Sequence, residues 1–324
     1  MAKLQSSEFV GVANRPATIC VNTVCLWFDT TNLKPMASYC SRSGAGAWSV
    51  GGALITARYG VAGAGTQNEG LAAGGTGAAT YSCTEEYNGT SWSAGGAMIT
   101  ARSFLAGAGT QNIGLIFGGF INATPGVACT EEYNGTSWSA GGAMITARTY
   151  LAGVGTQNEG LAAGGCVNAI VSCTEEYNGT SWSAGGALAI ARYTLSGIGT
   201  QNAGLVAAGA TNIAVSCTEE YNGTSWSTGG SIITTRYVTV GVGSQNESFI
   251  AAGYIANIGQ NQTCTEEYNG TSWSVAASLI TARRGLAGAG SQGAGLVVGG
   301  LTTVGVSCTE EYLKSSYTIV DCYL

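Results

Sequence analysis

Paired carboxylates are the residues of this sequence whose type and spacing could most readily do chemistry. A Glu-Glu dipeptide occurs six times, at 85/86, 131/132, 175/176, 219/220, 266/267 and 310/311. Two neighbouring acids are what glycoside hydrolysis requires. A catalytic site, however, needs a few unequal groups in one place, and these pairs recur regularly along the chain. Adjacent residues of a strand also point to opposite faces, so the two carboxylates of a pair would diverge.

The recurrence of these pairs favours a structural role. We predict that one glutamate of each pair is buried and meets an arginine that recurs in the same units, in a ring that runs from unit to unit. Removing one partner of a buried ion pair should cost about 3–5 kcal/mol. The residues assigned to this ring are Arg58, Arg102, Arg148, Arg192, Arg236, Arg283, Glu86, Glu132, Glu176, Glu220, Glu267 and Glu311.

No other motif supports an enzyme or a cofactor site. The chain has no histidine, the commonest general base and metal ligand. The recurring cysteines lie 44 to 47 residues apart and lack the clustered spacing of a metal site. Gly63-Ala-Gly65 falls in an expected strand with no helix after it, so it fails the context of a nucleotide loop. We therefore expect no catalytic residues, no metal and no cofactor.

Charge and hydropathy narrow the possible partners. The six Glu-Glu pairs and the six recurring arginines account for the net charge of −6, because the remaining acids and bases cancel. No basic patch indicates nucleic acid, and no run of 18 apolar residues indicates a membrane span. The N-terminal sequence MAKLQSSEFVGVANRP has no apolar core, so we expect no secretory signal.

Six of the eleven cysteines occupy one repeat position, where we expect small buried apolar residues. The others are Cys20, Cys25, Cys40, Cys166 and Cys322. A bridge from Cys322 to Cys20, Cys25 or Cys40 would lock the two ends of the chain together, and we keep it as a hypothesis.

The sequence CTEEYNGTSWSAGGA, first seen at residues 83–97, organises the whole chain. Its tyrosines fall at 87, 133, 177, 221, 268 and 312, with spacings of 46, 44, 44, 47 and 44 residues. This period is typical of a propeller with four-stranded antiparallel blades. The Asn-Gly that starts at Asn88 predicts a hairpin turn, which explains the formal Asn-Gly-Thr glycosylation sequons more simply.

The order Gly-Gly, then Glu-Glu-Tyr, then Trp, then Arg is similar to that of kelch repeats over residues 48–312. The resemblance implies an all-β, kelch-like propeller, with Gly-Gly closing the second strand and Tyr and Trp wedged between blades. We expect residues 1–16 to be a leader or docking segment and 17–324 to be one propeller, with an irregular blade at 17–52 and six regular repeats at 53–324.

The number of blades depends on which strand completes the sixth repeat. Tyr317 follows Tyr312 at the spacing that separates Tyr87 from Trp92, so the sixth repeat contains an outer strand of its own. Trp48 would then belong to an additional blade, which favours seven blades. The alternative is six, with the Trp48 strand closing the ring and the C-terminal strand outside it.

The N-terminal segment resembles a short module of phage tail and appendage proteins. The resemblance rests on Arg15-Pro16, on Leu26-Trp27-Phe28-Asp29-Thr30-Thr31-Asn32, and on Tyr39 and Trp48. The sequence departs from the module's Tyr-x-Gly-x-x-Trp by inserting residues between Tyr39 and Trp48. This similarity, over about 35 residues, implies a virion protein.

Variation between the repeats is concentrated in the loops before each cysteine. These loops are apolar and amide-rich, with almost no charge, and should lie on the face opposite the Thr-Gln-Asn and Asn-Gly turns. Loops on a rigid scaffold are the usual place for function. The candidate binding residues are Phe120, Ile121, Asn122, Tyr254, Asn257, Gln260, Asn261 and Gln262.

These features together predict a non-enzymatic structural or receptor-binding component of a virion, a bacteriophage tail fibre or capsid appendage made in the host cytoplasm. Its expected partners are other virion proteins, in a homo-oligomer or multi-copy assembly, and a host-surface glycan or protein. The alternative is a bacterial surface adhesin or lectin located outside the cell. A glycan-processing propeller enzyme is a third hypothesis, which the recurrence of the acid pairs disfavours.

Overall fold

The computed structural model describes residues 19–21, 24–29, 34–41, 46–121, 126–314 and 318–323, with side chains for 46–121 and 126–314. The chain divides into two compact units: Gly46–Leu313, and Met1–Ala45 with Lys314–Leu324. All regular elements of the described residues are strands. No described helix is long and apolar enough to cross a membrane. The predicted all-β class is therefore confirmed.

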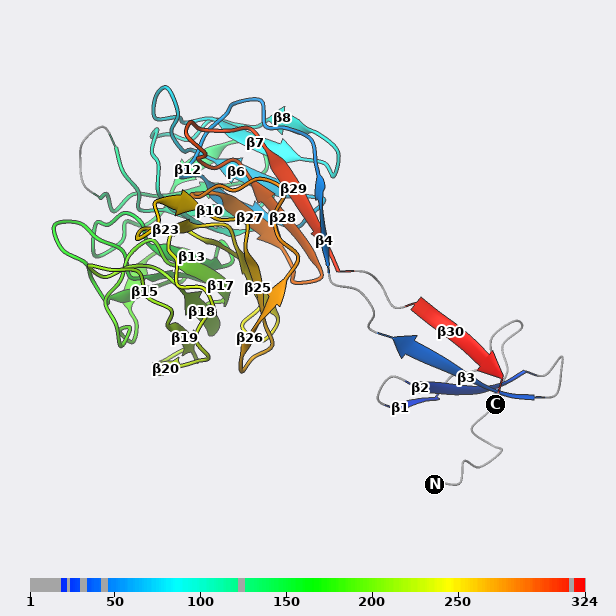
Figure 1. The fold of residues 1–324 in the computed structure, drawn as a ribbon. Coiled ribbons are helices and arrows are strands. Elements are labelled where there is room, and N and C mark those ends of the chain that lie inside the picture. Colours follow the sequence, from blue (N-terminus) through cyan, green and yellow to red (C-terminus); the bar gives the residue numbers. More distant parts are fainter. Residues whose placement is uncertain are drawn as a thin grey trace. The chain divides into compact units, whose positions relative to one another are not determined.

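The larger unit is a propeller of six blades, each a sheet of four antiparallel strands (Figure 1). In five blades the strands follow one another in the chain, from the axis outward. These blades are β5 (Ala62–Gly65), β6 (Gly70–Ala73), β7 (Thr84–Tyr87) and β8 (Trp92–Ala94); β9 (Ala106–Gly109), β10 (Gly114–Phe117), β11 (Thr130–Tyr133) and β12 (Trp138–Ala140); β13 (Ala152–Gly155), β14 (Gly160–Ala163), β15 (Thr174–Tyr177) and β16 (Trp182–Ala184); β17 (Ser196–Thr200), β18 (Ala203–Ala207), β19 (Thr218–Tyr221) and β20 (Trp226–Thr228); and β21 (Val240–Gly243), β22 (Ser248–Ala251), β25 (Thr265–Tyr268) and β26 (Trp273–Ala276).

The sixth blade is built from both ends of this unit. Its strands are β27 (Ala287–Gly290), β28 (Ala294–Val298), β29 (Thr309–Leu313) and, as the outer strand, β4 (Ala47–Val50). Trp48 on β4 lies opposite Tyr312 on β29. The favoured count of seven blades is therefore wrong, and the six-blade alternative, closed by the Trp48 strand, is correct.

Within the segment 17–52, predicted as an additional blade, the strands before residue 42 belong to a separate sheet in the smaller unit, whereas β4 belongs to the sixth blade. The strand order of this separate sheet is β1 (Ile19–Val21), β2 (Val24–Asp29), β3 (Lys34–Ser41), β30 (Thr318–Tyr323). The C-terminal strand β30 pairs with β3, so it does not supply an outer strand to the sixth repeat. The predicted leader at 1–16, and the side chains of Cys20, Cys25, Cys40 and Cys322, lie outside the described residues.

The repeat sequence determines each blade through local chemistry. The inner strands alternate small side chains with glycine, which lets neighbouring blades approach closely: a Cβ on Gly107 would lie 2.7 Å from the carbonyl oxygen of Gly63. The Asn-Gly hairpin has Gly89 at φ +86°, a conformation that favours glycine. The Asn88 side-chain oxygen accepts hydrogen bonds from the backbone N–H groups of Thr90 and Ser91, so this asparagine has a structural role in the turn.

A buried ion pair anchors the connection that leads into each blade. Arg58, which is 0% exposed, meets Glu85, which is 2% exposed. The Glu85 carboxylate also accepts the backbone N–H groups of Ile55 and Thr56. Arg236 meets Glu266 in the blade of β21 and β25, and the N–O distance is 3.1–3.2 Å in the other five blades. The arginine's partner is thus the first glutamate of each pair, and both residues belong to one repeat.

The second glutamate of each pair links neighbouring blades. Glu86 accepts a hydrogen bond from the hydroxyl of Tyr133 in the next blade, and the same link at 2.5–2.8 Å occurs six times. Trp138 adds a hydrogen bond from its indole N–H to Thr84 of the preceding blade. The link from Tyr87 to Glu311 joins the first blade to the last. Glu86, Glu132, Glu176, Glu220, Glu267 and Glu311 therefore form a ring with tyrosines, while the arginines bind Glu85, Glu131, Glu175, Glu219, Glu266 and Glu310.

The repeat cysteines are less buried than expected. Five are half-buried free thiols, and Cys129 is exposed. They lie beside the buried arginines. The sulfur of Cys173, for example, lies 2.9 Å from Nη1 of Arg148. Cys166 is also a free thiol.

We predict that removing the charge of one first glutamate destabilises the propeller strongly. Glu175→Gln leaves the Arg148 guanidinium buried without its counter-charge, and should lower the free energy of unfolding by about 3–5 kcal/mol, measured by urea denaturation. The matched control is the neighbouring Glu176→Gln, whose amide oxygen can still accept the Tyr221 hydroxyl, with an expected loss of about 1 kcal/mol. Equal losses for the two variants would contradict this assignment.

The tyrosine–glutamate ring predicts a loss of stability in alkali. Burial, followed by the hydrogen bond to Glu311, raises the pKa of Tyr87 to about 12, and four equivalent tyrosines have the same shift. A tyrosine whose pKa is raised above 10.0 on folding contributes stability that is complete below pH 10 and lost as the pH rises through about 12. The urea midpoint should therefore fall steeply across this window.

Tyr87→Phe is the control for this alkaline transition. It should be less stable near neutral pH by about 2 kcal/mol, because it lacks the hydroxyl that donates to Glu311 and accepts from the Gly52 N–H, yet show a shallower decline above pH 10 because one titrating group is gone. A decline with the same slope in both proteins would show that other groups cause the transition.

Candidate functional site

One end of the propeller carries all the variable loops, and we call it the loop face. Consecutive antiparallel strands place the second-to-third loop of each blade and the connection between blades at this end. The Thr-Gln-Asn and Asn-Gly turns lie together at the opposite end, where a Cβ on Gly89 would lie 3.3 Å from the side chain of Asn68. The predicted division between a variable and an invariant face follows from this sheet order.

An aromatic cavity opens on the axis of the loop face. It has a volume of about 260 Å³, and every blade contributes a side chain to it. Five of these side chains are aromatic and the sixth is an arginine: Tyr59, Phe104, Tyr150, Tyr193, Tyr237 and Arg284. All six are half-buried. We call this cavity the cup.

Each cup residue follows one of the buried arginines directly or after one residue. Tyr59, Tyr193, Tyr237 and Arg284 come immediately after the arginine, and Phe104 and Tyr150 come one position later. Because Glu85 holds the backbone at Ile55 and Thr56 and also binds Arg58, the chain is fixed just before it reaches the axis. The ion pairs of the blades therefore position the cup.

A closed ring of backbone hydrogen bonds surrounds the axis at the base of the cup. Each of six residues donates its N–H to the carbonyl of its counterpart in the preceding blade, at 2.8–3.2 Å, and the sixth bond closes the ring. The members of this axial ring are Gly60, Phe104, Tyr150, Thr194, Val238 and Gly285. All six have φ between +53° and +67°, which is costly for bulky and β-branched residues. Strain of this kind clusters at functional sites.

The cup walls are ordered by contacts between neighbouring side chains. The Phe104 and Tyr150 rings lie 4.4 Å apart, and Tyr59 packs edge-on to Phe104 with 5.8 Å between centroids. Tyr150 packs edge-on to Tyr193 at 6.1 Å. Burial raises the pKa of the Tyr150 and Tyr237 phenols.

Arg284 gives the cup a charged and asymmetric wall. Its guanidinium lies 4.3 Å over the ring of Tyr254, and Nη1 donates to the Asn261 side chain at 2.9 Å. The Asn261 amide in turn donates to the carbonyls of Leu301 and Thr302 at 3.0 Å. Arg284 is the one charged side chain among the described residues that line the cavity.

The predicted loop residues therefore divide into two groups. Tyr254 and Asn261 meet at Arg284, on the hairpin of β23 (Tyr254–Ile255) and β24 (Gln260–Asn261). Asn257 and Gln260 are exposed on that hairpin, and Gln262 is half-buried beside it. Phe120 and Ile121 lie in the loop of another blade and do not line the cup. Asn122 lies outside the described residues.

Sequence analysis missed the five aromatic residues of the cup, although a signal for them exists. The two residues after the buried arginine read Tyr-Gly, Ser-Phe, Thr-Tyr, Tyr-Thr, Tyr-Val and Arg-Gly in successive units. Five of these dipeptides contain one aromatic residue, in one position or the other. The one-residue shift hides the pattern from a comparison made column by column.

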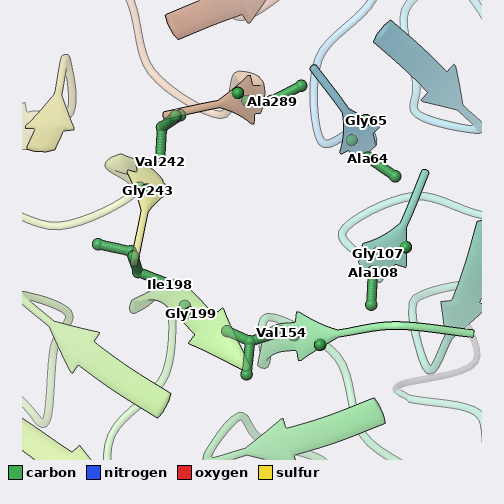
Figure 2. A pocket seen from close by; sticks show the side chains of 18 residues that line it. Ala64, Gly65, Gly107, Ala108, Val154, Ile198, Gly199, Val242, Gly243 and Ala289 are labelled. Carbon is green, nitrogen blue, oxygen red and sulfur yellow. The ribbon is translucent and has the colours of Figure 1, made fainter. Parts of the chain in front are cut away.

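At the opposite end of the axis from the cup, the inner strands surround a second cavity. Figure 2 shows the six strands around its opening, with Ala64, Ala108, Val154, Ile198, Val242 and Ala289 on successive blades. This part has a volume of about 120 Å³ and is lined by glycine and small apolar residues. It offers backbone groups but no side-chain chemistry. No group of three or more His, Cys, Asp or Glu among the described residues is placed to hold a metal ion.

Comparison with known proteins identifies the fold. No family model matches the sequence, and no curated protein matches it. A solved structure described as "Structure of YjhT" is similar, with a TM-score of 0.70 and 12% sequence identity over 85% of this chain and 100% of that chain. At this identity the likeness shows a shared β-propeller fold, and a fold does not specify a function.

We predict that the strain of the axial ring can be relieved by glycine. Val238 has φ +58°, which costs roughly 1–3 kcal/mol for a side chain of this kind. Val238→Gly should therefore leave the free energy of unfolding unchanged or raise it by up to about 1 kcal/mol, measured by urea denaturation, after the entropy of glycine is allowed for. The control Val240→Gly, at a buried position of β21, should lower it by about 2 kcal/mol or more. Equal losses would show that Val238 is not strained.

Proposed function

We propose that this protein is a non-enzymatic binding component of a virion, a bacteriophage tail or capsid appendage whose loop face contacts a host surface. The observation that carries the proposal is the cup, a preformed aromatic cavity on the axis of a closed propeller. Ligand sites are concave, mostly apolar and fitted with a few polar groups. The cup meets this description with five aromatic rings and one guanidinium.

The surroundings of the cup support contact with a partner. Five blades expose an isoleucine at one repeat position of the inter-blade connection, between 56% and 63% exposed: Ile55, Ile99, Ile145, Ile233 and Ile280. Because they recur at one position from blade to blade, these isoleucines would offer a partner the same apolar contact at several blades. The buried arginines bring no charge to this face, because each is 0% exposed and paired.

The proposal of a virion rests on the N-terminal resemblance. Arg15-Pro16 and the segment 26–32 are similar to a module of phage tail and appendage proteins, and the kelch-like order of the repeats suits a rigid binding head. The smaller unit would then serve for attachment to the particle. A bacterial surface adhesin or lectin is the second candidate, since the same cup would suit a protein displayed on a cell.

We predict that the purified chain competes with particles for their receptor. Pre-incubating host cells with the chain should slow adsorption, and the Tyr193→Ala and Tyr237→Ala variants should lose this effect because each removes a wall of the cup. Glu159→Gln, at an exposed position of the opposite face, should compete as the unmodified protein does. Adsorption is measured as the rate at which free particles disappear.

Two results would contradict this proposal. Mass spectrometry of purified particles that lack the chain, together with its recovery from the bacterial surface, would favour the adhesin. Turnover of a glycan by the purified chain would overturn the non-enzymatic assignment.

A further inference from the structure

The cup contains phenol groups that the scaffold does not use. The scaffold tyrosines, such as Tyr87 and Tyr133, donate their hydroxyls to glutamates of neighbouring blades. The hydroxyls of Tyr59, Tyr150 and Tyr193 make no such hydrogen bond among the described residues, and all three side chains line the cup. These aromatic side chains border the same small volume, and their hydroxyls are not used by the scaffold.

This combination specifies an amphipathic ligand. Tyrosine joins an apolar ring to a polar tip that can donate and accept hydrogen bonds. A partner must therefore offer C–H surface for the rings and hydroxyl groups for the phenols. The faces and edges of a pyranose sugar offer this pair of features.

The volume limits the ligand to a single ring. At about 260 Å³, the cup is just below the roughly 300–1,000 Å³ typical of sites for drug-sized molecules. The walls are also preorganised, because the axial ring fixes the backbone at Phe104 and Tyr150 and aromatic side chains lose little entropy on binding. A rigid cup of this size fits the end of a glycan better than its middle.

The state of Arg284 favours an uncharged sugar. Its guanidinium already donates to Asn261 and lies on the Tyr254 ring, so part of its charge is satisfied within the protein. The phenols around it both donate and accept hydrogen bonds, which matches the hydroxyl groups of a neutral sugar. Arg284 is left to donate to a neutral hydroxyl or carbonyl oxygen.

We propose that the cup binds one uncharged pyranose, the terminal sugar of a glycan, stacked on its aromatic walls and hydrogen-bonded by its phenols and Arg284. This inference rests on the proposed function and names the ligand class of the same site. An aromatic or aliphatic side chain of a protein partner is the competing occupant, which the free hydroxyls disfavour.

The inference is tested by saturation-transfer NMR and calorimetry with the full chain. The probes are the methyl glycosides of glucose, galactose, mannose and N-acetylglucosamine. For a ligand of this size the expected dissociation constant is on the order of 1 mM, for at least one glycoside. Saturation should be strongest at the C–H protons of one sugar face, because those protons contact the rings.

Variants assign the binding to the cup. Tyr193→Ala and Tyr237→Ala should each weaken binding about tenfold, and Tyr193→Phe, which keeps the ring, should weaken it less. Ile213→Ala is the matched control, since Ile213 is 74% exposed on a loop of the same face and does not line the cup. Thermal melting verifies that each variant is folded.

Several outcomes would overturn the inference. They are the absence of binding by all four glycosides, binding that both alanine variants leave unchanged, stronger binding of methyl glucuronide, or stronger binding of p-cresol as a mimic of a tyrosine side chain. If no glycoside binds but Tyr193→Ala still abolishes competition for adsorption, the sugar class is wrong while the proposed function stands. If a glycoside binds through the cup but no variant alters adsorption, the ligand class stands and the role in host attachment is wrong.

Discussion

The rest of the structure depends on the buried ion pair between an arginine and the first glutamate of each acid pair. Taking two charges out of water is costly, and the cost is offset only when the pair is close and fully hydrogen-bonded. Glu85 binds Arg58 and two backbone N–H groups of the connection between blades. Arg58 also donates to the carbonyls of Cys83 and Ala72, while its Nε has no hydrogen-bond partner among the described residues. The contacts that pair the two charges therefore also fix the backbone of the connection just before it reaches the propeller axis.

The two glutamates of a pair show how one dipeptide serves two levels of structure. Alternation along the strand sends Glu85 into its own repeat and Glu86 toward Tyr133 of the next blade. The first level folds the unit, and the second joins units into a closed ring. Sequence predicted that the two carboxylates diverge and that one is buried with an arginine. It assigned the second glutamate of each pair to the arginine, whereas the structure pairs the arginine with the first, because alternation alone does not say which face of the strand meets the arginine.

Periodicity determined the blade type but not the number of blades. Tyr317 and Trp48 both fit the outer-strand position of the sixth repeat, and a linear pattern cannot decide which strand pairs with β29. Pairing across the whole chain decides it, since β4 completes the last blade and β30 joins β3 in the smaller unit. The cup was missed for a related reason: its aromatic residues come from five of the six blades but change position by one residue, as at Tyr59 and Phe104. Only the structure shows that both positions reach the same cavity.

The sixth unit explains how a nearly symmetric scaffold can bind an asymmetric ligand. Six identical walls would offer a ligand six equivalent orientations. Arg284 replaces the aromatic residue in one unit, and it is held by Tyr254 and Asn261 from the hairpin of the preceding blade. Arg284 and the hairpin that holds it occur together in this unit. At the equivalent position of the first unit, Tyr59 packs on Phe104 instead. The repeated blades make the cup rigid, and Arg284 makes one wall different from the others, so that a bound ligand can adopt one preferred orientation.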